Sequence, residues 1–267
     1  MLYCDSHTHT KYSEDSREDP RASVEAAIKK GLKYIAITDH ADPAHPEGIL
    51  GVTEQMLSTY IAEIKALKEE YKNRINVTVG LEVGYSKEGV LTALKMLEGE
   101  YPEYVISSVH CVGGKDCYTP GFFDNLTREQ AVENYLNAVL ESVRVPYRID
   151  AVGHLGYLER IMPYDDKRIR FADFEPLLSE LFTEIIKREL ILEVNTSTGN
   201  SGAPTIPSPL LLKAYYDMGG RLVTTSSDAH YFSRIAHNFD TAQDELKKIG
   251  FKHLYVKQKG KLTELGI

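Results

Sequence analysis

The sequence predicts an α/β protein whose parallel strands form a distorted, seven-stranded (β/α) barrel. Short apolar runs alternate with helical patterns along the chain, which is the order that gives parallel strands joined by crossover helices. All but one of these runs end at a histidine or a carboxylate. The length of 267 residues suits one such barrel, which typically has about 250 residues.

Seven apolar runs have the length of strands. They span residues 2–6, 34–38, 77–82, 104–109, 149–153, 190–194 and 221–225. Eight strands are usual in a TIM-like barrel, so seven predict a distorted one, although an open doubly wound sheet would accommodate the same order. Neither an internal repeat nor a low-complexity linker divides the chain, and we therefore expect residues 1–267 to form a single domain.

The helices between the strands have recognisable ends. Pro20 follows Asp19 at the start of one helix, and Gly31 marks its end. Residues 127–130, Thr-Arg-Glu-Gln, have the form of a capping box, which begins a helix that runs to about residue 143.

Two further segments are expected to be helical. One begins at Ser208-Pro209 and ends at Gly219-Gly220. The other, residues 53–72, places apolar side chains at three- and four-residue steps along one face, which we expect to pack on the sheet. These side chains are Met56, Tyr60, Ile64 and Leu67. The tail, residues 253–267, is expected to be extended.

Composition and charge exclude several classes of protein. The net charge of -8 argues against a nucleic-acid-binding surface, which needs a basic patch. The start of the chain lacks the layout of a signal peptide, and no apolar run approaches the roughly 18 residues of a membrane helix. We therefore expect a cytoplasmic protein without a membrane or nucleic-acid partner; oligomeric state is left open.

The three cysteines, Cys4, Cys111 and Cys117, do not suggest a metal site or a disulfide framework. They are too few and too unevenly spaced for either, and we expect reduced thiols, with Cys4 and Cys111 in strands.

Histidines and carboxylates at the strand ends predict a metal centre, because the carboxyl ends of all strands in a parallel barrel open on one face. The candidate ligands are His7, His9, Asp15, His40, Glu82, His110, His154, Asp228 and His230. Imidazole and carboxylate ligands without thiolate suit zinc, manganese or iron, and nine are too many for one ion. Two or three divalent ions are expected. By contrast, His45, His237 and His253 have no such context, and we expect them at the surface.

The ordered set of motifs resembles that of the polymerase and histidinol phosphatase (PHP) superfamily, and within it the histidinol-phosphate phosphatases of the PHP type. The matching motifs are His7-Thr8-His9, Thr38-Asp39-His40, Gly80-Leu81-Glu82, Ser108-Val109-His110, Gly153-His154 and Ser227-Asp228-Ala229-His230. The resemblance covers essentially the whole chain.

The resemblance implies an assignment of ligands to ions. It gives the first ion to His7, His9, Glu82 and Asp228, the second to Glu82, His110 and His154, and the third to Asp15, His40 and His230. Some members of the superfamily have histidine where this chain has Asp15. A carboxylate favours harder cations such as manganese or iron(II), so the third ion is the one whose identity this change affects.

Such a site would hydrolyse a phosphate monoester, because divalent ions acidify a bridging water and neutralise charge on the phosphoryl group. Arg160 is the expected phosphate clamp and Arg234 a weaker second candidate. Asp228 or a metal-bound water is the candidate acid for the leaving group, and His230 belongs with Asp228 and Arg160 in the expected catalytic set.

The resemblance implies L-histidinol phosphate as the substrate, and hence a role in histidine biosynthesis. Asn195, which follows the sixth strand, is expected to line the substrate pocket, Asp42 to meet the amino group and Tyr118 to cover the ring. The alternatives are another small phosphate ester, a nucleotide or nucleic acid, or phosphotyrosine as substrate. A non-catalytic, metal-stabilised binding module is the rival from a different class.

Overall fold

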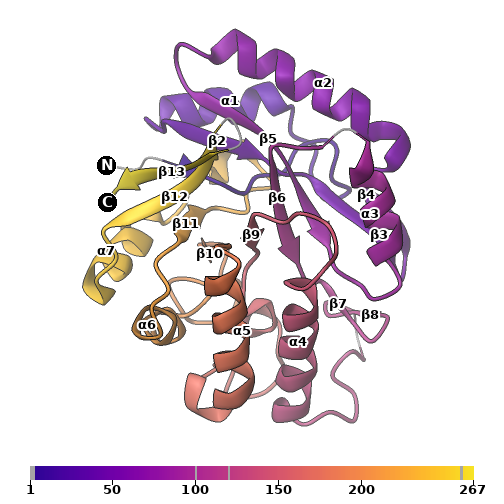
Figure 1. Ribbon diagram of the computed structural model, residues 1–267, viewed down its shortest axis with the longest axis vertical. Coiled ribbons are helices and arrows are strands. Elements are labelled where there is room, and N and C mark those ends of the chain that lie inside the picture. Colours follow the sequence, from indigo (N-terminus) through magenta and orange to yellow (C-terminus); the bar gives the residue numbers. More distant parts are fainter. Residues whose placement is uncertain (1–3, 100, 120, 259–260) are drawn as a thin grey trace.

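The computed structural model describes residues 4–99, 101–119, 121–258 and 261–267. Its centre is a run of seven parallel strands (Figure 1). In spatial order they are β1 (Cys4–Asp5), β2 (Tyr34–Ile37), β5 (Asn76–Gly84), β6 (Tyr104–Ser108), β9 (Ala151–Val152), β10 (Ile191–Asn195) and β11 (Val223–Ser226). Each neighbouring pair in this order is parallel. These strands are the seven expected from the sequence, except that residues 2 and 3 lie outside the described residues.

The first and last strands of this order meet, so the sheet is nearly closed. The Ser6 amide donates to the Thr225 carbonyl at 3.1 Å, and the Asp228 amide donates to the His7 carbonyl at 2.9 Å. A parallel bridge joins Thr8 to Ala229 just beyond the ends of β1 and β11. The distorted barrel is therefore confirmed, and the open doubly wound sheet is excluded.

Two antiparallel hairpins extend the barrel on the side where the strands end. The first consists of β3 (His40–His45) and β4 (Gly48–Gly51), and β3 also pairs in parallel with β5 through His40 and Glu82. The second consists of β7 (Cys111–Val112) and β8 (Lys115–Asp116). Both follow a ligand-bearing strand end directly, so they form walls around the region above the barrel.

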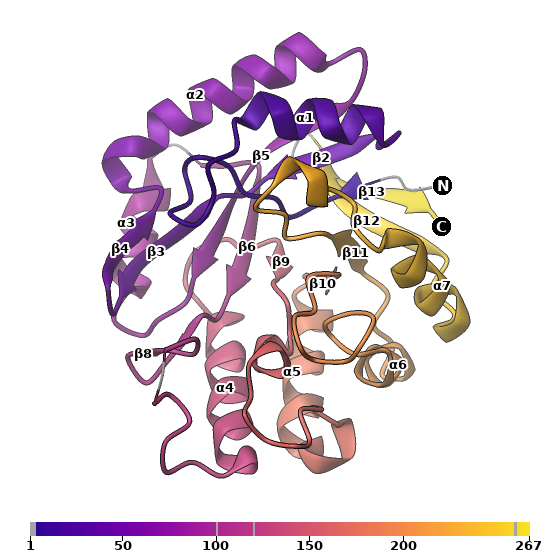
Figure 2. The ribbon, with the colours of Figure 1, turned by 180° about the vertical axis from the view of Figure 1, so that it is seen from behind.

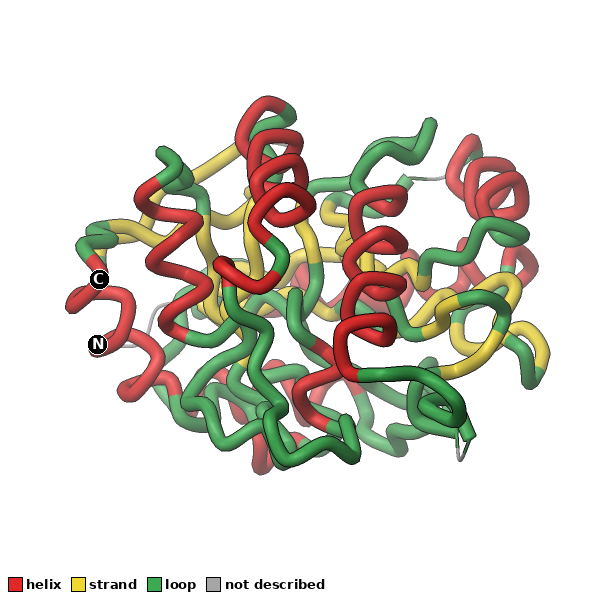
Figure 3. The backbone as a smooth tube through the Cα atoms, turned by 90° about the horizontal axis from the view of Figure 1, so that it is seen from below, coloured by secondary structure: helices red, strands yellow, loops and turns green. Residues whose placement is uncertain are grey.

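Helices cover the outside of the barrel, as all three views of the chain show (Figure 1, Figure 2, Figure 3). They are α1 (Pro20–Lys29), α2 (Glu54–Tyr71), α3 (Val90–Glu98), α4 (Arg128–Ser142), α5 (Glu175–Lys187), α6 (Pro209–Asp217) and α7 (Phe239–Ile249). Short 3-10 helices, η1 (Tyr157–Arg160), η2 (Phe171–Asp173) and η3 (Phe232–Arg234), lie in the connections. None of the helices within the described ranges has both the length and the apolar character needed to cross a membrane.

The helix ends follow from capping chemistry. The Asp19 carboxylate accepts from the Arg21 amide at 2.9 Å and caps α1. At α4, the Thr127 hydroxyl accepts from the Gln130 amide while the Gln130 side chain accepts from the Thr127 amide, which is the expected capping box. Proline opens α6 as expected.

The expected apolar face of α2 is wrong in its first turn. Tyr60, Ile64 and Leu67 are buried, but Met56 is 39% exposed and Leu57 is only 4% exposed. Leu57, Tyr60, Ile64 and Leu67 keep three- and four-residue steps, so the buried face begins at Leu57.

The tail forms an antiparallel hairpin, β12 (His253–Gln258) with β13 (Lys261–Gly266), rather than a single extended segment. Leu254 and Val256 are buried in the core. The Lys257 carbonyl accepts from the Thr78 hydroxyl at 3.4 Å. Thr78 lies near the start of β5, so the hairpin covers the end of the barrel opposite the candidate ligands.

Candidate metal centre

The nine candidate ligands lie together at the carboxyl ends of the strands. His7 and His9 follow β1, Asp15 lies in the next loop, His40 begins β3, Glu82 is in β5, His110 follows β6, His154 follows β9, and Asp228 and His230 follow β11. Except for Asp15, these side chains are buried or half-buried. Residues separated by more than 200 positions thus share one site because parallel strands end on one face.

Glu82 stands at the centre of this cluster. Its Oε1 lies 2.9 Å from His154 Nε2 and 3.2 Å from His110 Nε2. Its Oε2 lies 2.7 Å from His40 Nδ1 and 3.2 Å from His7 Nε2. One carboxylate therefore faces imidazoles from several strand ends, as a bridging ligand must.

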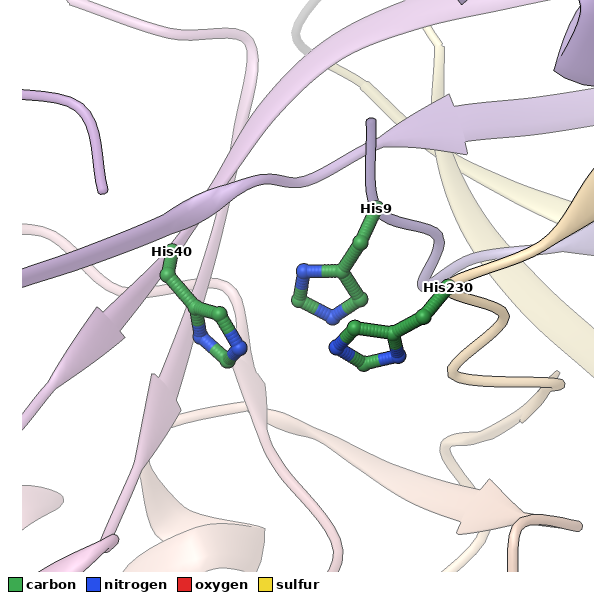
Figure 4. Close-up of side chains that lie close together, drawn as sticks. All are labelled: His9, His40 and His230. Carbon is green, nitrogen blue, oxygen red and sulfur yellow. The ribbon is translucent and has the colours of Figure 1, made fainter. Parts of the chain in front are cut away.

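Three imidazoles form a second group, shown in Figure 4. The His9 ring lies 4.0 Å from the His230 ring and 4.3 Å from the His40 ring, measured between ring centres. Asp15 Oδ2 completes the group at 3.0 Å from His230 Nε2 and 3.7 Å from His40 Nε2.

Asp228 connects the cluster to two neighbouring side chains. Its Oδ1 lies 3.2 Å from His9 Nε2, while its Oδ2 accepts from Arg160 Nη2 at 3.0 Å and from Asn195 Nδ2 at 3.3 Å. The backbone of Asp228 has a φ of 50°, in the left-handed region that a non-glycine residue adopts at a cost. Such a conformation at the end of β11 indicates that the placement of this carboxylate is under constraint.

The residues present fit divalent cations. His7 Nε2 and His9 Nε2 lie only 3.0 Å apart, although two lone pairs at that distance repel each other unless a proton or a cation lies between them. Several buried ligand atoms also lack a hydrogen bond of suitable geometry, although other ligand atoms lie close to them, and each such atom costs free energy. They are His40 Nδ1, Glu82 Oε2 and His230 Nε2. Oxygen and imidazole donors without thiolate are those of zinc, manganese and iron sites.

The buried carboxylates and imidazoles of the cluster shift one another's pKa values in opposite directions. Burial raises the pKa of the Glu82 carboxyl, but the neighbouring His7 and His110 outweigh burial and hold that pKa well below its usual value. Burial and the nearby His230 and His40 hold the pKa of His9 well below its usual value. Burial lowers the pKa of His7 and of His110, but the facing carboxylates, Glu82 among them, outweigh burial and raise both pKa values. The ionised Glu82 is the form that binds a metal, and a cation bound here would displace the protons of His7 and His110.

Two outer carboxylates are partners that the sequence analysis missed. Glu193 Oε1 lies 2.6 Å from His7 Nδ1. Asp39 accepts from the Thr10 amide and from the Ser13 hydroxyl, and that hydroxyl lies 3.0 Å from His9 Nδ1. Glu193 carried a signal, because it is a charged residue inside an otherwise apolar strand.

A cavity of about 570 Å³ opens onto the cluster, and three of the expected substrate-contacting residues line it: Arg160, Asp42 and Tyr118. Asn195 lies beneath Asp228, fully buried, and outside the cavity lining. Arg234 is exposed on η3 and is also outside the lining.

The expectation of a surface position for His45 is wrong. Its side chain is only 5% exposed, its Nε2 lies 3.6 Å from Asp116 Oδ2, and it lines the cavity. The hairpin of β3 and β4, which the sequence analysis did not foresee, carries His45 back over the barrel end. His253 does lie at the surface, with 40% of its side chain exposed, and His237 is half-buried.

The chain is similar to known proteins over nearly its whole length. The PHP domain model matches residues 5–197. A histidinol-phosphatase from Lactococcus lactis is 32% identical over 255 residues, which are 95% of this chain and 94% of that protein. A histidinol-phosphatase from Bacillus subtilis is 28% identical over 220 residues, 72% of this chain and 80% of that protein.

The solved structures agree with these matches. The crystal structure of the Lactococcus lactis histidinol phosphate phosphatase, in complex with zinc, L-histidinol and phosphate, superposes with a TM-score of 0.86 at 30% identity and covers 98% of both chains. A structure from Listeria monocytogenes, with a TM-score of 0.74 and 18% identity over 89% of this chain and 99% of that one, shares the fold. The chain therefore belongs to the PHP domain family.

Proposed function

We propose that this chain is a metal-dependent phosphomonoesterase that hydrolyses L-histidinol phosphate to L-histidinol and inorganic phosphate, a step of histidine biosynthesis. The observation that carries the proposal is the convergence of the nine candidate ligands beneath a cavity that also contains Arg160. The similarity to a phosphatase crystallised with zinc, L-histidinol and phosphate supports the choice of substrate.

The cluster would hold two or three divalent ions, with zinc, manganese and iron as the candidates. Four overlapping groups of side chains are close enough to hold an ion, and His9, His40, Glu82 and His110 each belong to two of them, so fewer than four ions are proposed. The groups are His7, His9 and Glu82; Glu82, His110 and His154; His9, His40 and His230; and His40, Asp42 and His110. When bound, the ions would lower the pKa of water and offset the negative charge of the phosphate. Glu82 is the residue that would be shared between the first two ions.

Arg160 is the proposed phosphate clamp. It is buried at the floor of the cavity, its Nη2 donates to Asp228 Oδ2, and its guanidinium carbon lies 5.3 Å from the centre of the Tyr157 ring. Its Nε makes no hydrogen bond. A guanidinium held by a carboxylate and an aromatic ring is oriented to bind phosphate oxygens without a large loss of side-chain entropy.

Asp228 and His230 complete the proposed catalytic set. The Nδ1–H of His230 donates to the Asp228 carbonyl at 3.0 Å, so Nε2 carries the lone pair, and it faces Asp15 Oδ2 at 3.0 Å. Asp228 faces both the ligand cluster and Arg160. Asp228 or a metal-bound water is the candidate acid that gives a proton to the leaving alkoxide.

The remaining substrate contacts are proposals of unequal support. Asp42 lines the cavity and would meet the substrate ammonium, although its Oδ2 is occupied by His110 Nδ1 at 2.9 Å and its Oδ1 is buried beside Gly84. Tyr118 is 54% exposed at the cavity wall, where it would cover the substrate ring. Asn195 would act through Asp228, and Arg234 is the weaker arginine candidate because it lies outside the lining. A cytoplasmic location and the absence of a nucleic-acid partner stay predictions.

Phosphate release from a panel of substrates tests the proposal. The zinc- or manganese-loaded protein is assayed with L-histidinol phosphate, a nucleoside monophosphate, a phosphotyrosine peptide and single-stranded DNA, with Asp228→Ala as the inactive control. We expect a clear preference for L-histidinol phosphate. Preference for another ester with negligible turnover of histidinol phosphate contradicts the substrate assignment. Hydrolysis by Asp228→Ala equal to that of the unmodified protein contradicts the assignment of the site.

A further inference from the structure

Glu193 is a buried carboxylate that belongs neither to the candidate ligands nor to the cavity wall. It lies in the middle of β10, pointing into the barrel, and is 1% exposed. A charge in such a place costs several kcal/mol of desolvation unless charged or polar partners surround it. The groups that contact the Glu193 carboxylate therefore indicate its role.

The first partner is His7. Glu193 Oε1 lies 2.6 Å from His7 Nδ1, a distance typical of a strong, charge-assisted hydrogen bond. An imidazole that donates its Nδ1–H has its lone pair on Nε2. In His7 that nitrogen faces the cluster, 3.2 Å from Glu82 Oε2 and 4.0 Å from Asp228 Oδ1. Glu193 thus selects the tautomer and the ring orientation in which His7 binds a cation.

The second partner is the segment that carries His154. The backbone amide of His154 donates to Glu193 Oε2, at the point where β9 ends. Asn195 Nδ2 adds a weaker contact to Oε1 at 3.3 Å and also reaches Asp228 Oδ2. A single side chain thereby joins the ligand after β1 to the ligand after β9, with the intervening β10 as its support.

The support of other ligand imidazoles is different. His110 Nδ1 meets Asp42, whose second oxygen makes no hydrogen bond, and His9 Nδ1 meets the Ser13 hydroxyl. Each of these contacts orients one ring. Glu193 uses both oxygens: Oε1 contacts His7 and Oε2 accepts from the His154 amide. His7 and His154 belong to two different ligand groups, and Glu82 is a member of both.

We propose that Glu193 is a positioning residue that fixes the tautomer of His7 and the spacing between His7 and His154, and so sets the metal affinity of the centre. The inference rests on the proposed metal site and is independent of which ester is hydrolysed. Outer partners of metal-bound histidines typically change metal affinity or activity about 10- to 100-fold.

Zn²⁺ affinity of the full chain, measured by competition with a chromogenic chelator, tests the inference in three variants. Glu193→Gln keeps the size of the side chain but replaces an acceptor oxygen with an amide donor. Glu193→Asp keeps the charge but withdraws the carboxylate by one methylene. Glu159→Gln is the matched control, because Glu159 is equally buried and its Oε1 accepts from the Ile169 amide, away from the ligands.

We expect Zn²⁺ to bind about 10- to 100-fold more weakly to both Glu193 variants and unchanged to Glu159→Gln. The visible absorption of the Co²⁺-loaded protein should also change in the Glu193 variants only. At saturating Zn²⁺, KM for the ester should stay constant, because Glu193 lies outside the cavity lining.

Zn²⁺ affinity within twofold of the unmodified protein in Glu193→Gln overturns the inference. Unchanged Zn²⁺ affinity in Glu193→Asp also overturns the inference, because the negative charge alone would then be sufficient and the position of the carboxylate would not matter. Equal losses in Glu159→Gln also overturn it, since any buried change would then suffice. If the unmodified protein does not bind Zn²⁺, both the role of Glu193 and the proposed function are refuted. If the unmodified protein binds Zn²⁺ and the Glu193 variants bind it equally well, only the role of Glu193 is refuted.

Discussion

Arg160 joins the metal centre to the cavity above it. Its guanidinium is held by Asp228 on one side and by the Tyr157 ring on another, and both contacts leave donors for a ligand in the cavity. Burial lowers the pKa of Arg160, but Asp228 and Tyr157 outweigh burial, so the pKa is raised and the group stays charged. A charged guanidinium in a fixed orientation can donate two hydrogen bonds to a phosphate group.

Replacement of Arg160 with alanine is therefore expected to lower kcat/KM for the phosphate ester by about 100-fold, since an oriented charged donor contributes on the order of 3 kcal/mol to the transition state. Zn²⁺ content should not change, because Arg160 is not a ligand. Arg170→Ala is the control, as Arg170 pairs with Asp166 on the surface. Equal kcat/KM in Arg160→Ala and Arg170→Ala would refute the clamp.

Glu159 gives the protein a pH-dependent stability that does not involve the cluster. Burial raises the pKa of this carboxyl from 4.5 to about 7. Between these values the folded state binds the proton that the unfolded state has lost, so the free energy of unfolding falls as pH rises from about 4.5 to about 7. The stability contribution is complete below pH 4.5 and is lost above the folded-state pKa.

Glu159→Gln should remove this dependence. Relative to the unmodified protein, the variant should gain about 3 kcal/mol of unfolding free energy between the two ends of that pH range. Urea unfolding of both proteins at each pH measures the difference and cancels the contribution of the histidines. A difference that does not vary with pH would contradict the raised pKa.

The candidate ligands were predictable because each follows an apolar run, and the rule that parallel strands end together does not depend on details of packing. Glu193 was not recognised because it lies inside a strand rather than at its end. His45 was misplaced because its burial depends on a hairpin. Contacts of this kind depend on the path of the chain beyond the strand, which a local pattern does not contain.

At the scale of elements, the sequence predicted the seven strands of the barrel and the helices α1, α2, α4 and α6. It did not name α3, α5 or α7, although proline lies in the first turn of α5 and Gly250 ends α7. β7 and β8 are only two residues each and are joined by Gly113 and Gly114, so the segment has the composition of a turn. β3 contains Pro43, which is confined to edges in sheets and argues against a strand. The periodicity of the sequence therefore does not predict these two hairpins, although residues of both line the cavity.

The capping box of α4 is a local signal whose energy can be measured. Thr127→Ala should lower the free energy of unfolding by about 1 kcal/mol, because the Gln130 amide loses its acceptor. Thr183→Ala is the control, since Thr183 is exposed in the interior of α5, where alanine is the better helix former. Chemical denaturation compares the two. A loss in Thr183→Ala as large as that in Thr127→Ala would contradict the capping account.

At the scale of the whole molecule, closure of the barrel between β1 and β11 brings the first and last ligands together. The contact of Asp228 with the His7 carbonyl belongs to that closure. The strand count suggested a barrel, but an open sheet fitted the same order, and only the pairing distinguishes them. The assignment to the PHP family, made from motifs, is confirmed by the family match. That residues 1–267 form one domain stays a prediction.

Because the ligand cluster forms only in the folded barrel, metal binding should stabilise the whole molecule. Zn²⁺ at about 100 times its dissociation constant should add about 2.7 kcal/mol per site to the free energy of unfolding. Thermal or urea unfolding with and without a chelator measures this gain. His45→Ala, which removes a histidine outside the proposed ligand set, should keep the gain, and His110→Ala should reduce it. Identical unfolding with and without the chelator would contradict a metal site in the folded state.

Elemental analysis of the purified chain after dialysis against Zn²⁺ tests the central claim most directly. The account predicts two or three ions per chain in the unmodified protein and fewer in Glu82→Ala, since Glu82 faces four of the histidines. Less than one ion per chain in correctly folded protein, or an equal number in Glu82→Ala, would contradict the claim that these strand ends form a multinuclear metal centre.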